Sequence, residues 1–228
     1  MEREKSMKLN DEHTLLSRFC GNDEYRPSFW NPFYDEHLEV VCATDAHCLI
    51  FGDKELFINE YRPLEKPIGL YNVIPVEEHT NRTISLSKLQ EFFDKVPYTK
   101  KHECPECGGT LKVHTDYEAK TGGSFYIEIE CPVCDGTGEV IGDEQKDQRY
   151  MLRIEHLCFA YRIIFVLAKT MEDLKVETIK VLALRELKLY VELLPGLKAL
   201  FMSKCKEEEL FKGADRFNPD LVIQYKFD

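Results

Sequence analysis

The segment Cys42-Ala-Thr-Asp-Ala-His-Cys-Leu49 decides the fold, because it separates two stretches that favour extended structure. Residues 37–43, which run into its start, and residues 49–51, which continue from its end, are rich in β-branched and apolar side chains, and Gly52-Asp53 ends the second stretch. Thr44 and Asp45 are residue types whose side chains satisfy backbone N–H groups in tight turns. The segment therefore predicts two strands joined by a turn.

A catalytic interpretation of the same segment is also open, because Asp45 and His47 form a His–Asp pair of the kind used in proton transfer. The sequence nearby offers no nucleophile and no third polar partner. Cys48 follows His47 directly, and neighbouring side chains on a strand point to opposite faces, so these two groups would not meet. We therefore favour the turn role over catalysis.

Two amphipathic helices are expected further along the chain. Residues 85–96 place Leu86, Leu89 and Phe92 on one stripe, and residues 159–174 repeat this helical spacing. Shorter apolar stretches predict strands at residues 69–75, 150–154, 176–182, 186–193, 197–202 and 220–227, with a solvated linker at 145–148. We expect an α+β domain in which the two helices pack on an antiparallel sheet.

Two cysteine pairs, Cys104-Pro-Glu-Cys107 and Cys131-Pro-Val-Cys134, give the strongest chemical signal. Each pair places two thiols on one tight turn, and four thiolates satisfy the tetrahedral preference of Zn²⁺. The pattern predicts a structural zinc site held by Cys104, Cys107, Cys131 and Cys134. A complete set of four thiolates leaves no open position for a catalytic water, and it makes His102 and His114 unnecessary as ligands.

The stretch between the cysteine pairs alternates like two strands around Thr121-Gly122-Gly123, which predicts a hairpin. So short a segment buries too little apolar surface to fold without its metal. We expect a zinc-ribbon-like module at residues 100–141, inserted in a discontinuous domain formed by residues 1–99 and 142–228.

Composition limits the class of protein. The chain has 228 residues, 43% of them hydrophobic, and a formal net charge of −11, which argues against generic binding to the nucleic-acid backbone. No apolar run has the roughly 18 residues of a membrane span, and the charged start does not resemble a signal peptide. We expect a cytoplasmic protein with reduced thiols, in which the five remaining cysteines are small buried hydrophobic residues.

The opening segment resembles the Ala-Thr-Asp-Gly-His-Arg-Leu signature of bacterial DNA sliding clamps, the β subunit of the replicative polymerase. The resemblance includes Arg18-Phe19, Asp23-Glu24 and Arg26-Pro27 upstream, and residues 196–202 look like the closing hairpin of a clamp domain. Ala46 replaces the signature Gly, Cys48 replaces the signature Arg, and Ser203 replaces a Pro. The resemblance implies a clamp-like domain.

In that family, residues around the signature help to form a pocket for peptide tails of polymerases and repair factors. Carried over residue by residue, the resemblance implies such a partner-peptide pocket at Thr44, Asp45, His47, Leu49 and Met202. A ring around DNA needs six clamp-type domains, and this chain supplies at most two. A ring would therefore require self-assembly into a homo-oligomer.

The cysteine module has a second resemblance. Cys131-Pro-Val-Cys-Asp-Gly-Thr-Gly138 is similar to the Cys-x-x-Cys-x-Gly-x-Gly knuckles of the DnaJ cysteine-rich region, whereas the first pair matches this pattern only in part. Such knuckles occur in proteins that bind unfolded chains, nucleic acids or other proteins, so the resemblance supports a metal site without choosing a partner.

Basic residues on the two predicted helices are the candidates for DNA contact. Lys88 and Lys95 are seven residues apart, as are Arg162 and Lys169, so each pair shares one helical face. The clamp resemblance implies that such helices present cations to phosphates. An ordinary solvated face is the alternative, because acidic residues lie among them.

Two hypotheses of different classes follow. The first is a non-enzymatic replication or repair accessory protein that binds DNA or a DNA-processing protein, with zinc as a structural element. The second is a protein-interaction adaptor on a clamp-like scaffold, which uses the zinc hairpin as its recognition surface and does not contact DNA. No small-molecule substrate and no membrane partner is indicated.

Overall fold

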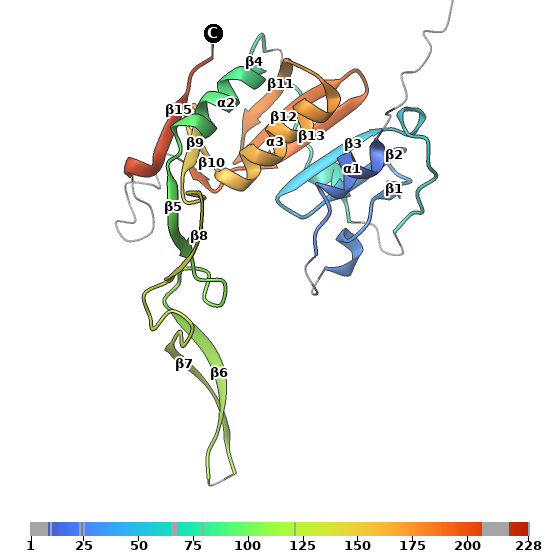
Figure 1. The fold of residues 1–228 in the computed structure, drawn as a ribbon. Coiled ribbons are helices and arrows are strands. Elements are labelled where there is room, and N and C mark those ends of the chain that lie inside the picture. Colours follow the sequence, from blue (N-terminus) through green and yellow to red (C-terminus); the bar gives the residue numbers. More distant parts are fainter. Residues whose placement is uncertain are drawn as a thin grey trace, which may run out of the picture. The chain divides into compact units, whose positions relative to one another are not determined.

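The computed structural model describes residues 9, 11–22, 24, 26–64, 68–78, 80–120, 122–206 and 219–227 (Figure 1). The chain divides into two compact units, one formed by Met1–Phe93 with Arg149–Asp228 and the other by Asp94–Gln148. The predicted module at residues 100–141 falls within the second unit. None of the helices in the described part of the chain has the length and apolar character needed to cross a membrane.

A seven-stranded antiparallel sheet organises the first unit, in the order β1-β2-β3-β13-β12-β11-β4. In chain order its strands are β1 Phe33–Asp35, β2 Val40–Thr44, β3 Cys48–Asp53, β4 Thr83–Ser85, β11 Thr178–Arg185, β12 Lys188–Leu194 and β13 Leu197–Met202. Strand β3 pairs with β13, so that Leu49 lies opposite Leu200. This pairing places the opening segment beside the distant closing hairpin β12–β13 in one sheet.

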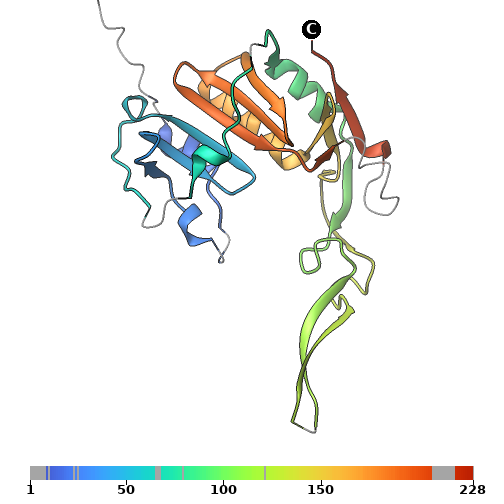
Figure 2. The same ribbon diagram turned by 180° about the vertical axis from the view of Figure 1, so that it is seen from behind.

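Three α-helices occur in the described part of the chain, the two amphipathic helices that we predicted and a shorter one that precedes them. They are α1 Glu12–Ser17, α2 Leu86–Lys95 and α3 Tyr161–Leu174. Asp11 caps α1 by accepting the Thr14 N–H at 3.2 Å. Helix α3 buries Ile164, Leu167 and Met171, and both views show it lying along one face of β11–β13 (Figures 1 and 2). The apolar residues of α3 recur at helical spacing because they face the sheet, as we predicted.

A second sheet of four strands completes this unit, in the order β14-β10-β9-β15. Its strands are β9 Met151–Ile154, β10 Leu157–Ala160, β14 Cys205–Lys206 and β15 Val222–Tyr225. The last strand, β15, runs parallel to β9, whereas the other pairs are antiparallel.

The second unit contains two two-stranded sheets. One joins β5 Tyr98–Glu103 to β8 Glu139–Lys146, and the other joins β6 Lys112–Glu118 to β7 Ser124–Glu130. The register of β6 and β7 is unbroken from the Lys112–Glu130 pair to the Glu118–Ser124 pair.

Three local predictions are wrong. Cys20, one of the five cysteines expected to be buried, is only half-buried. The strand predicted at residues 69–75 is a 3₁₀ turn, Leu70–Asn72, which follows Gly69 in a left-handed conformation (φ 59°). Leu70 is apolar because it packs in the core with Phe33 and Leu49, and strand pairing is not involved. The linker predicted at residues 145–148 is also incorrect, because β8 continues to Lys146 and Asp147 is buried.

Candidate metal centre and turn site

The four predicted zinc ligands come together in one cluster. Cys104 and Cys107 lie on the loop after β5, and Cys131 and Cys134 lie on the loop after β7. All four side chains are buried, and their Sγ atoms lie within 4.8 Å of one another. The Sγ atoms of Cys104 and Cys131 are 3.7 Å apart, as are those of Cys107 and Cys134.

These distances fit a metal-binding set. A tetrahedral ion with Zn–S bonds of about 2.3 Å has S···S edges of about 3.8 Å, close to both of these separations. A disulfide would need about 2.05 Å. The cluster therefore has the donor atoms and the spacing that a thiophilic tetrahedral ion requires, with two ligands supplied by each loop.

The two cysteine loops repeat one local geometry. The Thr110 Oγ1 lies 2.6 Å from the Cys107 carbonyl oxygen and 3.0 Å from that of Lys112. The Thr137 Oγ1 makes the same two contacts, to the carbonyl oxygens of Cys134 and Glu139, at the same distances. A threonine three residues after each pair thus closes each loop and fixes the direction in which its strand leaves.

The repeat includes the one position at which the first loop departs from the knuckle pattern. Gly138, the last glycine of the second loop, has a φ of 75° and donates its N–H to the Cys134 Sγ at 3.2 Å. Leu111 occupies the equivalent place in the first loop and also has a positive φ, 73°. The backbone therefore keeps the knuckle conformation at Leu111 although a side chain is present, which is unfavourable for an L-residue.

The thiols differ in how readily they ionise. Burial raises the pKa of Cys131 to about 11. Burial also raises the pKa of Cys134, but the Gly138 N–H and the neighbouring thiols outweigh this effect and lower the pKa to about 7. A hydrogen bond to sulfur that stabilises the thiolate is a usual feature around metal-bound cysteines.

Neither nearby histidine belongs to the cluster found among the described residues. The Nε2 of His102 lies 2.6 Å from the Asp143 carbonyl oxygen, and its Nδ1 lies 3.0 Å from the Gln145 side chain. His114 stacks on Tyr126 with ring centroids 4.8 Å apart. Both rings are thus engaged elsewhere.

The turn between β2 and β3 has the structure expected from its sequence. The Asp45 Oδ1 accepts the N–H groups of His47 and Cys48 at 2.9 and 2.7 Å. The Thr44 Oγ1 accepts the Ala46 N–H at 3.0 Å and donates to the Cys48 carbonyl at 2.7 Å. Ala46 has a φ of 73°, a left-handed conformation that glycine adopts more readily than alanine.

The five residues of the implied peptide pocket divide into two groups. Met202 donates its N–H to the His47 carbonyl at 2.8 Å, so Thr44, Asp45, His47 and Met202 gather around the turn. Leu49 instead packs in the hydrophobic core with Phe33 and Leu182. Burial raises the pKa of the neighbouring Cys48 thiol, which keeps it protonated.

Three of the four predicted DNA-binding cations have partners within the chain. Arg162 forms an ion pair with the Asp45 carboxylate, and Lys169 lies 2.6 Å from the Glu172 carboxylate. Lys88 donates to the Lys226 carbonyl at 2.9 Å and lies over the Tyr225 ring. Lys95 is exposed. The sequence pattern did not predict that Lys88 would contact Tyr225 and Lys226.

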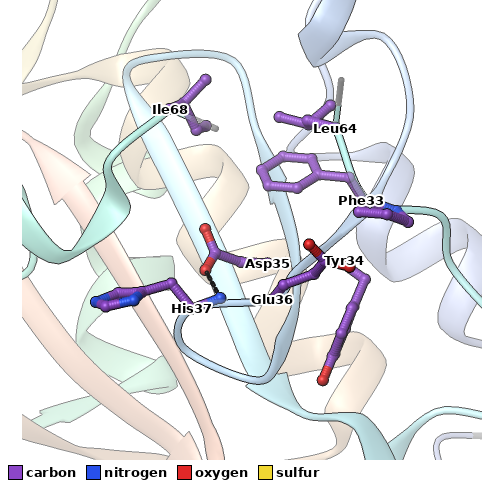
Figure 3. Close-up of a pocket in the computed structure, with 8 residues that line it drawn as sticks. Phe33, Tyr34, Asp35, Glu36, His37, Leu64 and Ile68 are labelled. Carbon is purple, nitrogen blue, oxygen red and sulfur yellow. Dashed lines mark hydrogen bonds between the residues drawn. The ribbon is translucent and has the colours of Figure 1, made fainter. Parts of the chain in front are cut away.

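A cavity of about 310 Å³ lies at the β1 end of the first unit, a position that the sequence did not indicate (Figure 3). It is lined by Phe33, Tyr34, Asp35, Glu36, His37, Pro63, Leu64 and Ile68. The Asp35 Oδ1 accepts the N–H groups of His37 and Leu38 at 3.1 and 2.9 Å. Its carboxylate therefore closes a turn.

No protein-family profile matches the chain, and no curated protein matches it significantly. Among solved structures, the chain is similar to DNA polymerase III subunit beta from Borrelia burgdorferi, with a TM-score of 0.46 and 13% identity over 89% of this chain. The match spans 63% of the length of that protein.

Two further structures show a comparable likeness. The polymerase III beta subunit from Thermotoga maritima has a TM-score of 0.45 and 12% identity, over 90% of this chain and 67% of that one. The C. crescentus beta sliding clamp has a TM-score of 0.45 and 10% identity, with the same coverage. At these identities the likeness concerns the fold alone.

Proposed function

We propose that this chain is a non-enzymatic accessory protein of DNA replication or repair, which serves as an adaptor on a clamp-like scaffold. It binds a DNA-processing protein. Its recognition surface is the β6–β7 hairpin, which lies between the two cysteine loops in the chain. The resemblance of residues 42–49 to the clamp signature supports the replication or repair context. The closed four-thiol cluster supports a structural role for the metal, because no position remains for a reacting water.

One observation favours the adaptor over direct DNA contact. Arg162, Lys169 and Lys88, three of the four cations proposed for DNA, have acceptors within the chain. Affinity for the DNA backbone comes from cations that replace the counterions of phosphates, so cations already neutralised or hydrogen-bonded contribute less. The net charge of −11 also disfavours binding to the DNA backbone.

Zinc would be held by Cys104, Cys107, Cys131 and Cys134 and would tie the two loops that begin and end the hairpin. In the second unit the zinc–thiolate bonds would take the place of a hydrophobic core. The buried cluster there consists of the four cysteines, with Val113 and Val140 packed on it. The hairpin is thereby held in one register without being covered.

The test is DNA binding by the zinc-loaded full chain, measured by fluorescence anisotropy from about 20 to 200 mM salt, together with its mass in solution. The adaptor predicts no binding to duplex or single-stranded DNA at the lowest salt. Binding that weakens steeply with salt and is lost on Lys95→Ala and Arg162→Ala would overturn the proposal. A ring-sized homo-oligomer that binds DNA would favour the sliding-clamp alternative.

A further inference from the structure

The β6–β7 hairpin has one uncovered apolar face. Side chains alternate along a strand, so the register puts every second cross-strand pair on the same face. The apolar face consists of Thr115, Tyr117, Phe125, Ile127 and Ile129, and Val113 at its end packs on the cysteine cluster. Tyr117 and Phe125 are 52% and 57% exposed, and Ile127 and Ile129 are 37% and 39% exposed. Contiguous exposed apolar surface is a feature of interaction sites.

The opposite face is polar and, along β7, acidic. Strand β7 carries Ser124, Tyr126, Glu128 and Glu130 on this face and has no basic residue. The only lysine of the two strands, Lys112 on β6, lies 2.8 Å from the Glu128 carboxylate. Hydrogen bonding to Lys112 lowers the pKa of Glu128, which keeps it charged.

Strand β7 also has an open edge among the described residues, because its sheet contains β6 and no other strand. Open edges are usually protected by charged side chains, above all lysine, by proline or by a bulge, and the only charged residues of β7 are Glu128 and Glu130. Strand β7 contains no lysine or proline, and its register with β6 has no bulge. Its β-branched and aromatic residues favour strand addition.

We propose that the open edge of β7 binds an extended segment of a partner protein in which apolar and basic residues alternate. The segment becomes a third strand. Its apolar side chains extend the apolar face next to Phe125 and Ile127, and its basic side chains lie next to Glu128 and Glu130. This inference rests on the proposed adaptor function and names the class of partner. Two strands alone are only marginally stable, so a third strand also stabilises the hairpin.

Charge complementarity selects this occupant over a second copy of the chain. Two β7 strands paired edge to edge would bring the acidic faces together without a basic residue from either strand. Like charges on neighbouring strands are destabilising. A basic segment instead supplies opposite charge on one face and apolar contact on the other.

The experiment uses the zinc-loaded full chain and a synthetic peptide in which valine and lysine alternate over about the length of β7. One control peptide has the same composition with valines and lysines grouped, and another has glutamate in place of lysine. Amide hydrogen exchange of β7 and peptide affinity are measured together. The alternating peptide is expected to bind and to slow exchange along β7, and neither control peptide is expected to do so.

Variants locate the surface. Glu128→Lys is expected to weaken binding of the valine–lysine peptide by about tenfold. Glu144→Lys, the same charge change at an exposed position on β8, is expected to leave the affinity unchanged. Equal loss in both variants would overturn the proposal, because it would show only attraction to net negative charge.

Two other outcomes would also overturn the inference. Slow exchange along β7 without peptide, in a chain whose mass is doubled, would assign the edge to a second copy. Unchanged exchange with the alternating peptide would reject strand addition while leaving the adaptor function standing if the chain binds no DNA. Salt-dependent DNA binding would instead reject the adaptor function itself.

Discussion

Arg162 on α3 forms an ion pair with Asp45 in the turn between β2 and β3. The Asp45 side chain is only 5% exposed, whereas that of Arg162 is 62% exposed. One carboxylate oxygen holds the turn and the other binds the guanidinium. A residue of the implied peptide pocket and a residue of the implied DNA face are therefore partners of each other.

Substitution of these two residues should have unequal effects on stability. Asp45→Ala removes the acceptor of two turn N–H groups and should lower the free energy of unfolding by about 1–3 kcal/mol. Arg162→Ala removes an exposed partner and should cost less than about 1 kcal/mol. Urea unfolding of both variants measures the difference. Equal losses would contradict the turn as the main role of Asp45.

Loss of one cysteine ligand should abolish metal binding. The wild-type chain should contain one zinc ion per molecule, and Cys131→Ser should lose it together with the structure of the second unit. Cys20→Ser is the matched control, because Cys20 lies in the first unit and outside the cluster. Elemental analysis and hydrogen exchange provide the measurements. Substoichiometric zinc in native protein would contradict the metal site.

Two glycines with positive φ should respond differently to alanine. A Cβ at Gly138 would lie 2.8 Å from the Leu111 Cδ2 and 3.0 Å from the Gly109 carbonyl oxygen, whereas a Cβ at Gly122 meets nothing within 4 Å. Gly122→Ala should cost only backbone strain of about 1–2 kcal/mol. Gly138→Ala should also release zinc to a weaker chelator, which competition titration detects. Similar zinc affinity in both variants would disprove the close packing.

Glu12 should make stability depend on pH. It is buried on α1 and accepts the Asn59 N–H at 2.9 Å and the Tyr61 hydroxyl at 3.0 Å. Burial raises its pKa, but hydrogen bonds from Ile58, Asn59 and Tyr61 outweigh burial and hold the pKa below the ordinary 4.5. Its stabilisation is therefore complete above 4.5 and is lost as the pH falls through the lower folded value.

The variant Glu12→Gln tests this linkage. It should be less stable than the wild type by about 1–3 kcal/mol near neutral pH. The difference should shrink in acid, as the wild-type carboxylate becomes protonated. Urea midpoints across an acid series measure it, with Glu91→Gln, at an exposed position on α2, as the control. A difference that is independent of pH would exclude the carboxylate charge as the cause.

Local patterns in the sequence predicted the features that short-range chemistry determines. The turn at Thr44 and Asp45 forms because its side chains reach backbone groups two to four residues away. Periodicity predicted helices α2 and α3, and ligand spacing predicted the Cys104 and Cys131 loops. These features also depend on residues that are close together in the chain.

Contacts between distant residues were not predictable in this way. Arg162 and Asp45 are 117 positions apart, and Lys88 and Lys226 are 138 apart. No periodicity relates such positions, so the cations appeared available for DNA. The strand predicted at residues 69–75 failed for a similar reason, since Leu70 is apolar to cover a core built by other segments.

The pairing of β3 with β13 has a consequence for synthesis of the chain. Strand β3 finds its second neighbour only after Leu197–Met202 has left the ribosome, so the large sheet closes late. The cysteine cluster is complete once Cys134 has emerged. We therefore expect the nascent chain to bind its metal first. The β6–β7 hairpin would then be folded before β13 is available to pair with β3.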